Sequence, residues 1–403
     1  MAYAASRRKK VTLGAAHWVK ILRLLRDQID DLAIEIDNIS RIVVKFADKA
    51  LLFSSEWNKY KVNTDELKKI QKDTVFAGVD SSITPPVRLG PYLISAVSAA
   101  AIITKGITEN PVKILNSSIA RAPELANPEN AYYELKIEMF ELEVKIMEEC
   151  MSKIMEMYED NGEKIVFMDG PLVDPPTFPR RDQKLRERYE NEYIKRRAET
   201  ILDGIKNNIL TLGIVKKIEG NSLVSNLCSK TGAQCDVLQK LNDYTLTTLI
   251  FKSQYIPSFL RGLAKGEDEE VILTTKPYEL PYNTDYSVYK KYGLHIYSFY
   301  ILPRLKDPRK RVLRVEIPFD HEPSDAELET CAWKSAKYIA AAALPGHSVP
   351  TPVVLAHKAS TIPRSAARKV VKEATSRFLT ASLSKKTSLE ARGAIDLAKG
   401  LVE

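Results

Sequence analysis

Two short segments of the sequence each place an aspartate at the end of an apolar, strand-forming run. VFAGVDSS at 75–82 ends its run on Asp80, and IVFMDG at 165–170 ends its run on Asp169. An unpaired carboxylate is costly to remove from water, so its repeated placement at a strand end indicates that the charge is used. Carboxylate oxygens suit Mg²⁺ and Mn²⁺, and a pair of such ions can activate water against a phosphodiester. The pattern therefore predicts a divalent-metal site.

The segment between the two strands supplies a further acid. It predicts a helix over 130–159, and stepping 100° per residue gives an apolar arc that runs from Phe140 to Tyr158. Glu143 falls inside this arc, which favours it as a third ligand. Alternatively, Glu143 lies at the flank of the arc and its carboxylate reaches solvent. In that case, Glu141 or Glu148 could be the third metal ligand. The residues leave open whether one or two ions bind.

The elements that would position these acids follow a recognisable order. Apolar runs predict strands at 74–80, 92–104 and 111–117, then the helix and a strand at 164–169. Three antiparallel strands that lead through a helix to a parallel neighbour form the layout of the ribonuclease H-like fold. We therefore predict an α/β fold: a ribonuclease H-like mixed sheet flanked by helices, with a long N-terminal helix and a mid-chain helical insertion.

The remaining segments define the expected domains. Between 17 and 53, apolar residues recur at steps of three and four, which predicts a long helix that forms a coiled coil or packs on the core. The expected division is listed by residue range: 1–70, an N-terminal helical region; 71–218, the first part of the core; 219–284, an insertion of helices and loops; 285–403, the second part of the core with C-terminal helices.

Composition excludes several classes of protein. The 403 residues are 44% hydrophobic and 28% charged, which is ordinary for a globular chain, and the net charge of +8 mildly favours a polyanionic partner. The 4 cysteines are too few and too scattered for a disulfide framework. The most apolar stretch, 92–104, is shorter than the roughly 20 residues of a membrane helix, and no signal peptide is visible. A soluble, cytoplasmic protein is expected, without a membrane partner.

Five segments in order along the chain resemble the NurA family of archaeal and bacterial proteins. Besides the two aspartate motifs, they are LGIVKKIEGNSL at 212–223, RVLRVEIPF at 311–319 and VPTPVVLAHKASTI at 349–362. The resemblance implies a ribonuclease H-like nuclease that requires Mn²⁺ or Mg²⁺, degrades DNA 5′ to 3′ and cuts single strands internally. It also implies a homodimer that acts beside a hexameric HerA-type ATPase in the resection of double-strand break ends.

The resemblance also assigns residues. Asp80 and Asp169 match the metal-binding aspartates, Glu143 is placed as the helix glutamate, and His357 matches the C-terminal histidine that would ligate a metal or assist the leaving group. Tyr300, or Tyr297, matches the family's functional tyrosine. Packing within a helix or a strand is the alternative for His357 and for the tyrosines. The first motif reads Asp-Ser-Ser where the family has Asp-Gly-Ser, which a serine with ordinary backbone angles accommodates.

Basic residues near the second aspartate motif are candidates for phosphate contact. They are Arg180, Arg181, Lys184 and Lys216. Glutamates interleave with the first three, so a solvated helix face with internal ion pairs is the alternative. Nothing in these segments is suited to reading base edges, so little sequence specificity is expected. The competing functions are a non-catalytic adaptor that binds DNA or a translocase, and another ribonuclease H-like nuclease such as a junction resolvase.

Overall fold

Secondary structure is given for the residues that the structure describes. The structure is a computed structural model that describes residues 25–26, 28–41, 57–89, 92–106, 110–123, 128–158, 162–173, 182–218, 220–221, 223–225, 241–252, 269–280, 284–305, 311–344 and 347–384. Residues 28–41 are helical. The other elements are β1 (Trp57–Asn63), α3 (Thr64–Asp73), β2 (Val75–Ile83), β3 (Val87–Leu89), β4 (Tyr92–Lys105), β5 (Val112–Pro123), α4 (Pro128–Met157), β6 (Lys164–Asp169), α5 (Gln183–Arg188), η1 (Tyr189–Ile194), α6 (Lys195–Lys206), β7 (Ile209–Val215), α9 (Asp243–Lys252), β8 (Glu269–Thr275), β9 (Tyr278–Glu279), α10 (Thr284–Lys291), β10 (His295–Leu302), β11 (Leu313–Phe319), α11 (Asp325–Ala342), α12 (Thr351–Ser360) and α13 (Arg364–Ser384).

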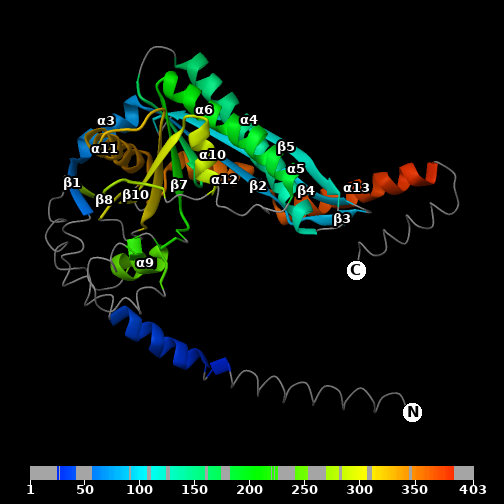
Figure 1. Ribbon diagram of the computed structural model, residues 1–403, viewed down its shortest axis with the longest axis horizontal. Coiled ribbons are helices and arrows are strands. Elements are labelled where there is room, and N and C mark those ends of the chain that lie inside the picture. Colours follow the sequence, from blue (N-terminus) through cyan, green and yellow to red (C-terminus); the bar gives the residue numbers. More distant parts are fainter. Residues whose placement is uncertain are drawn as a thin grey trace. The chain divides into compact units, whose positions relative to one another are not determined.

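The strands form one mixed sheet, whose main path runs β1-β8-β10-β11-β7-β6-β2-β4-β3, with β5 paired to β4 (Figure 1). β4 is antiparallel to β2 and to β5, whereas β6 is parallel to both β2 and β7. When the short β3 is left out and the strands are numbered along the chain from β2, the strands β5-β4-β2-β6-β7 lie in the order 3-2-1-4-5, and the second is antiparallel. This is the order of the ribonuclease H-like fold, so the predicted fold class is confirmed.

Three strands of the sheet, β1, β8 and the two-residue β9, lie in segments that the sequence pattern assigned to helices and loops. β8 pairs with β1 and with β10, although its residues fall inside the expected insertion at 219–284. β1 falls inside the expected N-terminal helical region. The pattern missed them because β1 lies at an edge of the sheet and mixes polar and apolar residues, and because the EEVILTT of β8 follows a long irregular stretch.

The chain divides into two compact units, one formed by Met1–Ser55 with Glu219–Leu263 and one by the remainder, which contains the sheet. In the first unit, the apolar residues Leu25, Ile29, Leu32 and Ile36 of the N-terminal helix are 46–62% exposed. The coiled coil remains a prediction, and most of the helix expected over 17–53 lies outside the described residues. Among the described helices, none has the length and apolar character needed to cross a membrane.

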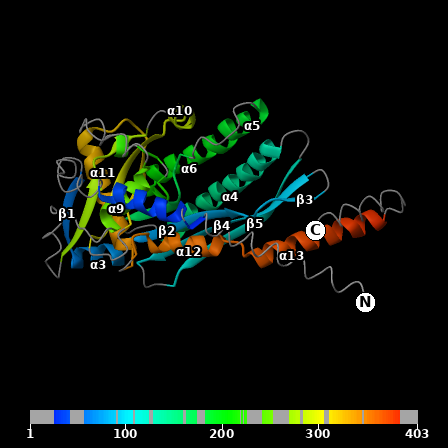
Figure 2. The same ribbon diagram turned by 90° about the horizontal axis from the view of Figure 1, so that it is seen from below.

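Helices cover both faces of the sheet, and alternate side chains of each strand reach different layers. Val75, Ala77 and Val79 of β2 pack in a cluster with α4 and α6, whereas Phe76 packs in a second cluster with α3, α11 and α12. Figure 1 shows α4 along β4 and β5, and Figure 2 shows α12 beside β2. Because successive side chains of a strand point to opposite faces, the faces reached by Asp80 and by Ser81 are different.

The contact of α12 with β2 requires a glycine. A Cβ atom on Gly78 would collide with the backbone carbonyl of Pro352 in the first turn of α12. Gly78 lies on the same face of β2 as Asp80, two residues before it. The absence of a side chain at Gly78 therefore lets α12 lie against β2 and bring its later residues to Asp80.

Candidate metal site

Asp80 and Asp169 lie side by side where the parallel pairing of β2 with β6 ends: Asp169 is the last residue of β6, whereas β2 continues past Asp80 to Ile83. Val79 pairs with Met168 in the register of β2 and β6, and the two aspartates come next on each strand. Phe76 points to the same face of β2 as Asp80, and Phe167 to the same face of β6 as Asp169. Both phenylalanines pack in the cluster on the α12 face of the sheet. The side chains of the two aspartates are only 8% and 6% exposed. The fold thus brings two carboxylates to one buried point at the end of the sheet.

α12 supplies two more polar groups to this point. Nδ1 of His357 lies 3.0 Å from Asp80 Oδ2 and 3.5 Å from Asp169 Oδ2. One turn later, the Ser360 hydroxyl donates to Asp80 Oδ2 at 2.5 Å. The His357 side chain is 57% exposed, so the site is open to solvent on the side of the imidazole.

The turn after β6 fixes the direction of the Asp169 side chain. Gly170 has a φ of 136°, a conformation that favours glycine, and its N–H donates to the carbonyls of Met168 and Ile214. The fully buried Glu316 of β11 accepts from the N–H groups of Leu172 and Val173 at 2.6 and 3.2 Å. The chain therefore turns sharply at Gly170 and is held by a buried carboxylate.

The positively charged side chain of Lys216 lies beside Asp169. Nζ of Lys216, the residue that follows β7, lies 2.5 Å from Asp169 Oδ2. Leu212 and Ile214 of β7 pack in the cluster on the α12 face, and Lys216 continues their alternation. Lys216 was predicted as a phosphate contact, and the structure places it beside the aspartate itself.

The donor set fits a divalent cation. One ligand atom from each of Asp80, Asp169 and His357 lies within 4.8 Å of the others, the only such set found among the described residues. Burial and the nearby charge of Asp169 raise the pKa of Asp80. The hydrogen bond from Ser360, and the charge and hydrogen bond of His357, oppose that rise. Two carboxylates and an imidazole are ligands that Mn²⁺ and Mg²⁺ accept. A cation at this point would relieve the repulsion between the two buried carboxylates.

Glu143, the predicted third ligand, lies apart from this set. Its carboxylate accepts a hydrogen bond from the Ser81 hydroxyl at 2.5 Å and lies 3.7 Å from the guanidinium of the buried Arg197. Because α4 covers the face opposite α12, Glu143 meets Ser81 and not Asp80. The structure thus does not place Glu143 in the set formed by Asp80, Asp169 and His357, and its role as a ligand stays a prediction.

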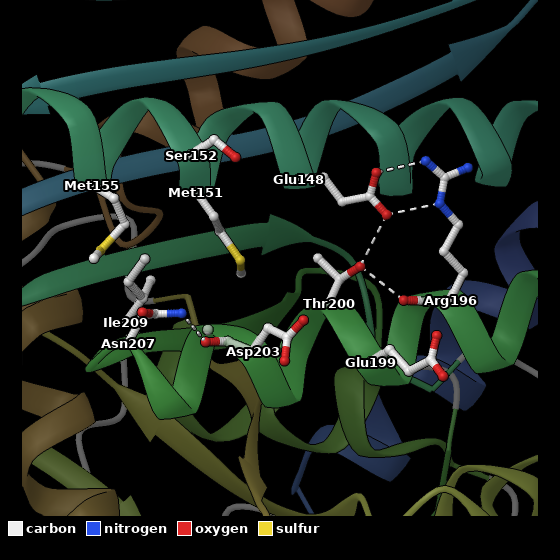
Figure 3. Close-up of a pocket in the computed structure, with 11 residues that line it drawn as sticks. Glu148, Met151, Ser152, Met155, Arg196, Glu199, Thr200, Asp203, Asn207 and Ile209 are labelled. Atoms are coloured by element: carbon white, nitrogen blue, oxygen red, sulfur yellow. Dashed lines mark hydrogen bonds and ion pairs between the residues drawn. The ribbon is translucent and has the colours of Figure 1, made fainter.

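The two alternative glutamates are bound by arginines of the next long helix. Glu141 receives two hydrogen bonds from Arg188, and Glu148 receives two from Arg196. Figure 3 shows Glu148 pointing into a pocket of about 630 Å³ between α4 and α6, where it also meets Thr200. Neither glutamate belongs to the metal set.

Tyr300 also lies away from the aspartates. It is a buried residue of β10, its ring stacks on Tyr278, and its N–H donates to Thr275. β10 is separated from β6 by β11 and β7, and three strand spacings amount to roughly 14 Å. The structure thus shows Tyr300 packed within the sheet, and a functional role for it stays a prediction. Tyr297, the alternative, lies on the same strand and packs edge-on against Phe319.

The basic candidates differ in their surroundings. Lys184 is exposed on α5, and Arg180 and Arg181 lie outside the described residues. Nearby, Arg186 pairs with Glu190 four residues later, as in the predicted alternative of an ion-paired helix face, whereas Arg188 pairs with Glu141 of α4.

Sequence reasoning missed Ser360 and Glu316. Ser360 follows His357 by three residues in the quoted motif, so the spacing of neighbours on a helix could have indicated it. Glu316 stands in the quoted RVLRVEIPF segment, and its position between the apolar residues Val315 and Ile317 of a strand was the available signal.

Comparison with known proteins decides the family. A model of the NurA domain matches residues 74–362, which cover most of the chain and all three residues of the metal set. The chain belongs to the NurA family. This NurA-family chain is also similar to two solved structures described as NurA and as NurA bound to dAMP and manganese. The first has 13% identity, a TM-score of 0.46, and coverage of 91% of this chain and 99% of that one. The second has 14% identity, a TM-score of 0.43, and coverage of 85% and 95%.

A third similar structure is human ENDOV, with 13% identity, a TM-score of 0.33, and coverage of 77% of this NurA-family chain and 92% of that one. None of the curated proteins compared with the sequence matches it.

Proposed function

We propose that this NurA-family protein is a metal-dependent nuclease that hydrolyses DNA phosphodiesters at Asp80, Asp169 and His357. The observation that carries the proposal is the convergence of these three side chains, two from the parallel strands β2 and β6 and one from α12. When bound, Mn²⁺ or Mg²⁺ would supply a positive charge that polarises the attacking water and the phosphate oxygen. The family resemblance supports DNA as the substrate.

The residues of the chain have separate roles in this reaction. Asp80 and Asp169 would hold the cation, and Ser360 keeps the Asp80 carboxylate in place by its hydrogen bond. His357, which is more exposed than the aspartates, completes the ligand set on the side where DNA enters. Lys216 brings positive charge to the same point, and Lys184, with Arg180 and Arg181, contacts the phosphate backbone further along the strand.

The finer activity follows the family resemblance. We propose 5′-to-3′ exonuclease action on single- and double-stranded DNA, with internal cutting of single strands. The protein would act as a cytoplasmic homodimer in double-strand break resection, beside a hexameric HerA-type ATPase. The expected domain division, with a nuclease core interrupted by an insertion, belongs to the same proposal.

The test is cleavage of 5′- and 3′-labelled single- and double-stranded DNA with Mn²⁺, Mg²⁺ or EDTA. The wild type should release the 5′ label first, only with metal, and Asp80→Ala should release none. His321→Ala is the matched control, because His321 is an exposed histidine that pairs with Asp320 and Glu327 just after β11, at the end of the sheet opposite the metal set. If no metal supports cleavage while the protein still retards DNA, the non-catalytic adaptor replaces the nuclease.

A further inference from the structure

The face of the sheet that carries the metal set continues onto β4 and β5. In the register of these strands, Asp80 of β2 lies opposite Ala100 of β4, and Ala100 lies opposite Leu115 of β5. Residues that lie opposite one another on antiparallel strands point to the same face of the sheet. Two strand spacings amount to roughly 10 Å, so Leu115 lies about that far from Asp80, on the α12 face.

The two faces of β5 differ in exposure. Ile114 and Ala120 pack in clusters with α4, whereas Leu115 and Ile119, which point to the other face, are 59% and 53% exposed. Tyr92 of β4 lies on the same face, opposite the end of β5, and is 45% exposed. A patch of exposed apolar side chains marks an interaction surface. The exposed residues of this face are called the β5 strip: Tyr92, Lys113, Leu115, Ser117, Ile119 and Arg121.

The charges of the β5 strip favour a polyanion. Lys113 and Arg121 are exposed toward its two ends, and neither forms an ion pair within the described part of the chain. By contrast, Arg186 and Arg196 on the helices across the sheet are each paired with a glutamate. The strip itself contains no acidic residue, so its two positive charges are available to phosphates.

The dimensions of the β5 strip suit a single strand of DNA. Lys113 and Arg121 lie roughly 27 Å apart along the strand, because each residue adds about 3.4 Å. A stacked DNA strand advances about 3.4 Å per nucleotide, so the strip spans about eight nucleotides. Proteins that bind single strands combine basic side chains with aromatic rings on which bases stack. Tyr92 provides such a ring, whereas the bases of a duplex are stacked on one another and cannot use it.

We propose that the β5 strip binds single-stranded DNA and leads it to the metal set. This inference rests on the proposed nuclease function, and it names the form of DNA that the protein holds. Tyr92 stacks on a base, Lys113 and Arg121 contact phosphates, and Leu115 and Ile119 support the bases between them. The bound strand crosses β4 to reach Asp80. Because stacking and phosphate contact do not read base edges, the binding is independent of sequence.

The phosphate contacts are tested by the salt dependence of binding in EDTA, where no cleavage occurs. Fluorescence anisotropy of a labelled oligothymidine of about 20 nucleotides, longer than the strip spans, gives the affinity. Lys113→Gln/Arg121→Gln should lower the slope of log affinity against log salt by about 1.4, and the affinity at about 0.1 M salt about tenfold or more. The control Lys61→Gln/Lys68→Gln removes two exposed lysines on β1 and α3 and should keep the wild-type slope.

The stacking contact is tested by comparing the oligothymidine with a duplex of the same length. Tyr92→Ala should weaken binding of the single strand about fivefold or more and binding of the duplex less than about twofold. In cleavage with Mn²⁺, the same variant should raise KM for the single strand and leave kcat almost unchanged. The matched control is Tyr132→Ala, which removes a 38% exposed tyrosine from α4 on the other face of the sheet and should match the wild type.

Three results would overturn the inference. One is a salt slope of Lys113→Gln/Arg121→Gln equal to that of its control. Another is an equal loss of single-strand and duplex binding in Tyr92→Ala. The third comes from sedimentation velocity of Leu115→Ser, which should keep the oligomeric state of the wild type. A shift from dimer to monomer would show that a second copy of the chain, and not DNA, covers the β5 strip.

The same measurements separate this inference from the proposed function. A wild type that binds the single strand through the β5 strip but cleaves none with Mn²⁺ contradicts the nuclease function and leaves the strip as a DNA-binding surface. A wild type that cleaves DNA, with strip variants that keep its affinity and KM, overturns the inference alone. Equal melting temperatures of the variants and their controls would show that each of them folds.

Discussion

At the scale of single residues, Asp80 is a carboxylate placed where its charge is unfavourable without a cation. Burial and the charge of Asp169 raise its pKa, so the folded protein binds the Asp80 proton more tightly than the unfolded chain does. The stability that comes from this tighter proton binding is fully present below the ordinary pKa of aspartate, about 3.9. It is lost as the pH rises through the raised pKa of Asp80 in the folded protein. At neutral pH the ionised Asp80 therefore lowers the stability of the metal-free protein.

The isosteric substitution Asp80→Asn should consequently raise the melting temperature in EDTA at pH 7 and change it little below pH 4, since the aspartate is then protonated. Differential scanning calorimetry at both pH values measures this. Asp203→Asn, which removes the charge of an exposed aspartate, serves as the control and should shift the melting temperature little. A lower melting temperature for Asp80→Asn at pH 7 would contradict the account.

His357 should contribute to metal affinity more than to folding. Its side chain is 57% exposed, and its Nδ1 faces both aspartates. His357→Ala is expected to weaken Mn²⁺ binding about 10- to 100-fold, the range for groups that support a metal site, and excess Mn²⁺ should recover part of the cleavage. His321→Ala should leave the Mn²⁺ dependence unchanged. Cleavage by His357→Ala with the wild-type Mn²⁺ dependence would show that the imidazole is not a ligand.

At the scale of elements, the site depends on the close approach of α12 to β2. Gly78→Ala places a Cβ atom against the Pro352 carbonyl, so α12 must move and carry His357 and Ser360 away from Asp80. We expect a loss of about 1–3 kcal/mol of stability, typical of overpacking, together with weaker Mn²⁺ binding. Chemical denaturation and a Mn²⁺ titration measure the two effects.

Gly220→Ala is the matched control for this prediction, because a Cβ atom at Gly220 would meet nothing within 4 Å. Its stability and Mn²⁺ affinity should equal those of the wild type. If Gly78→Ala binds Mn²⁺ as tightly as Gly220→Ala does, the position of α12 does not govern the metal set.

The elements that sequence could predict are those whose pattern is local. The apolar runs that end at Asp80 and Asp169 predicted β2 and β6, and chain order predicted that these strands lie side by side. Sequence could not predict that Glu143 meets Ser81 and not Asp80, because the apolar arc of a helix shows which residues face the sheet but not which face of the sheet the helix covers. That choice depends on the packing of α4 opposite α12, which no local pattern encodes.

At the scale of the whole molecule, the sheet extends beyond the five strands that define the fold. β1 and β8 join it through pairings between segments about 200 residues apart, such as Tyr60 with Ile272. Such pairings depend on the tertiary structure, so the sequence indicated the central strands but not this extension. The proximity of Lys216 to Asp169 was hidden for a similar reason, since it follows from the pairing of β6 with β7.

The central claim is that Asp80, Asp169 and His357 hold the ion that cleaves DNA. Asp169→Asn tests it most directly, because this substitution keeps the shape of the side chain and removes one ligand charge. Mn²⁺ binding and single-turnover cleavage of a labelled DNA strand would be measured on the same preparations of wild type and variant. We predict that Asp169→Asn loses both Mn²⁺ binding and cleavage, at least about 1000-fold in rate, while its far-ultraviolet circular dichroism is unchanged. Cleavage by Asp169→Asn at the wild-type rate would contradict the account.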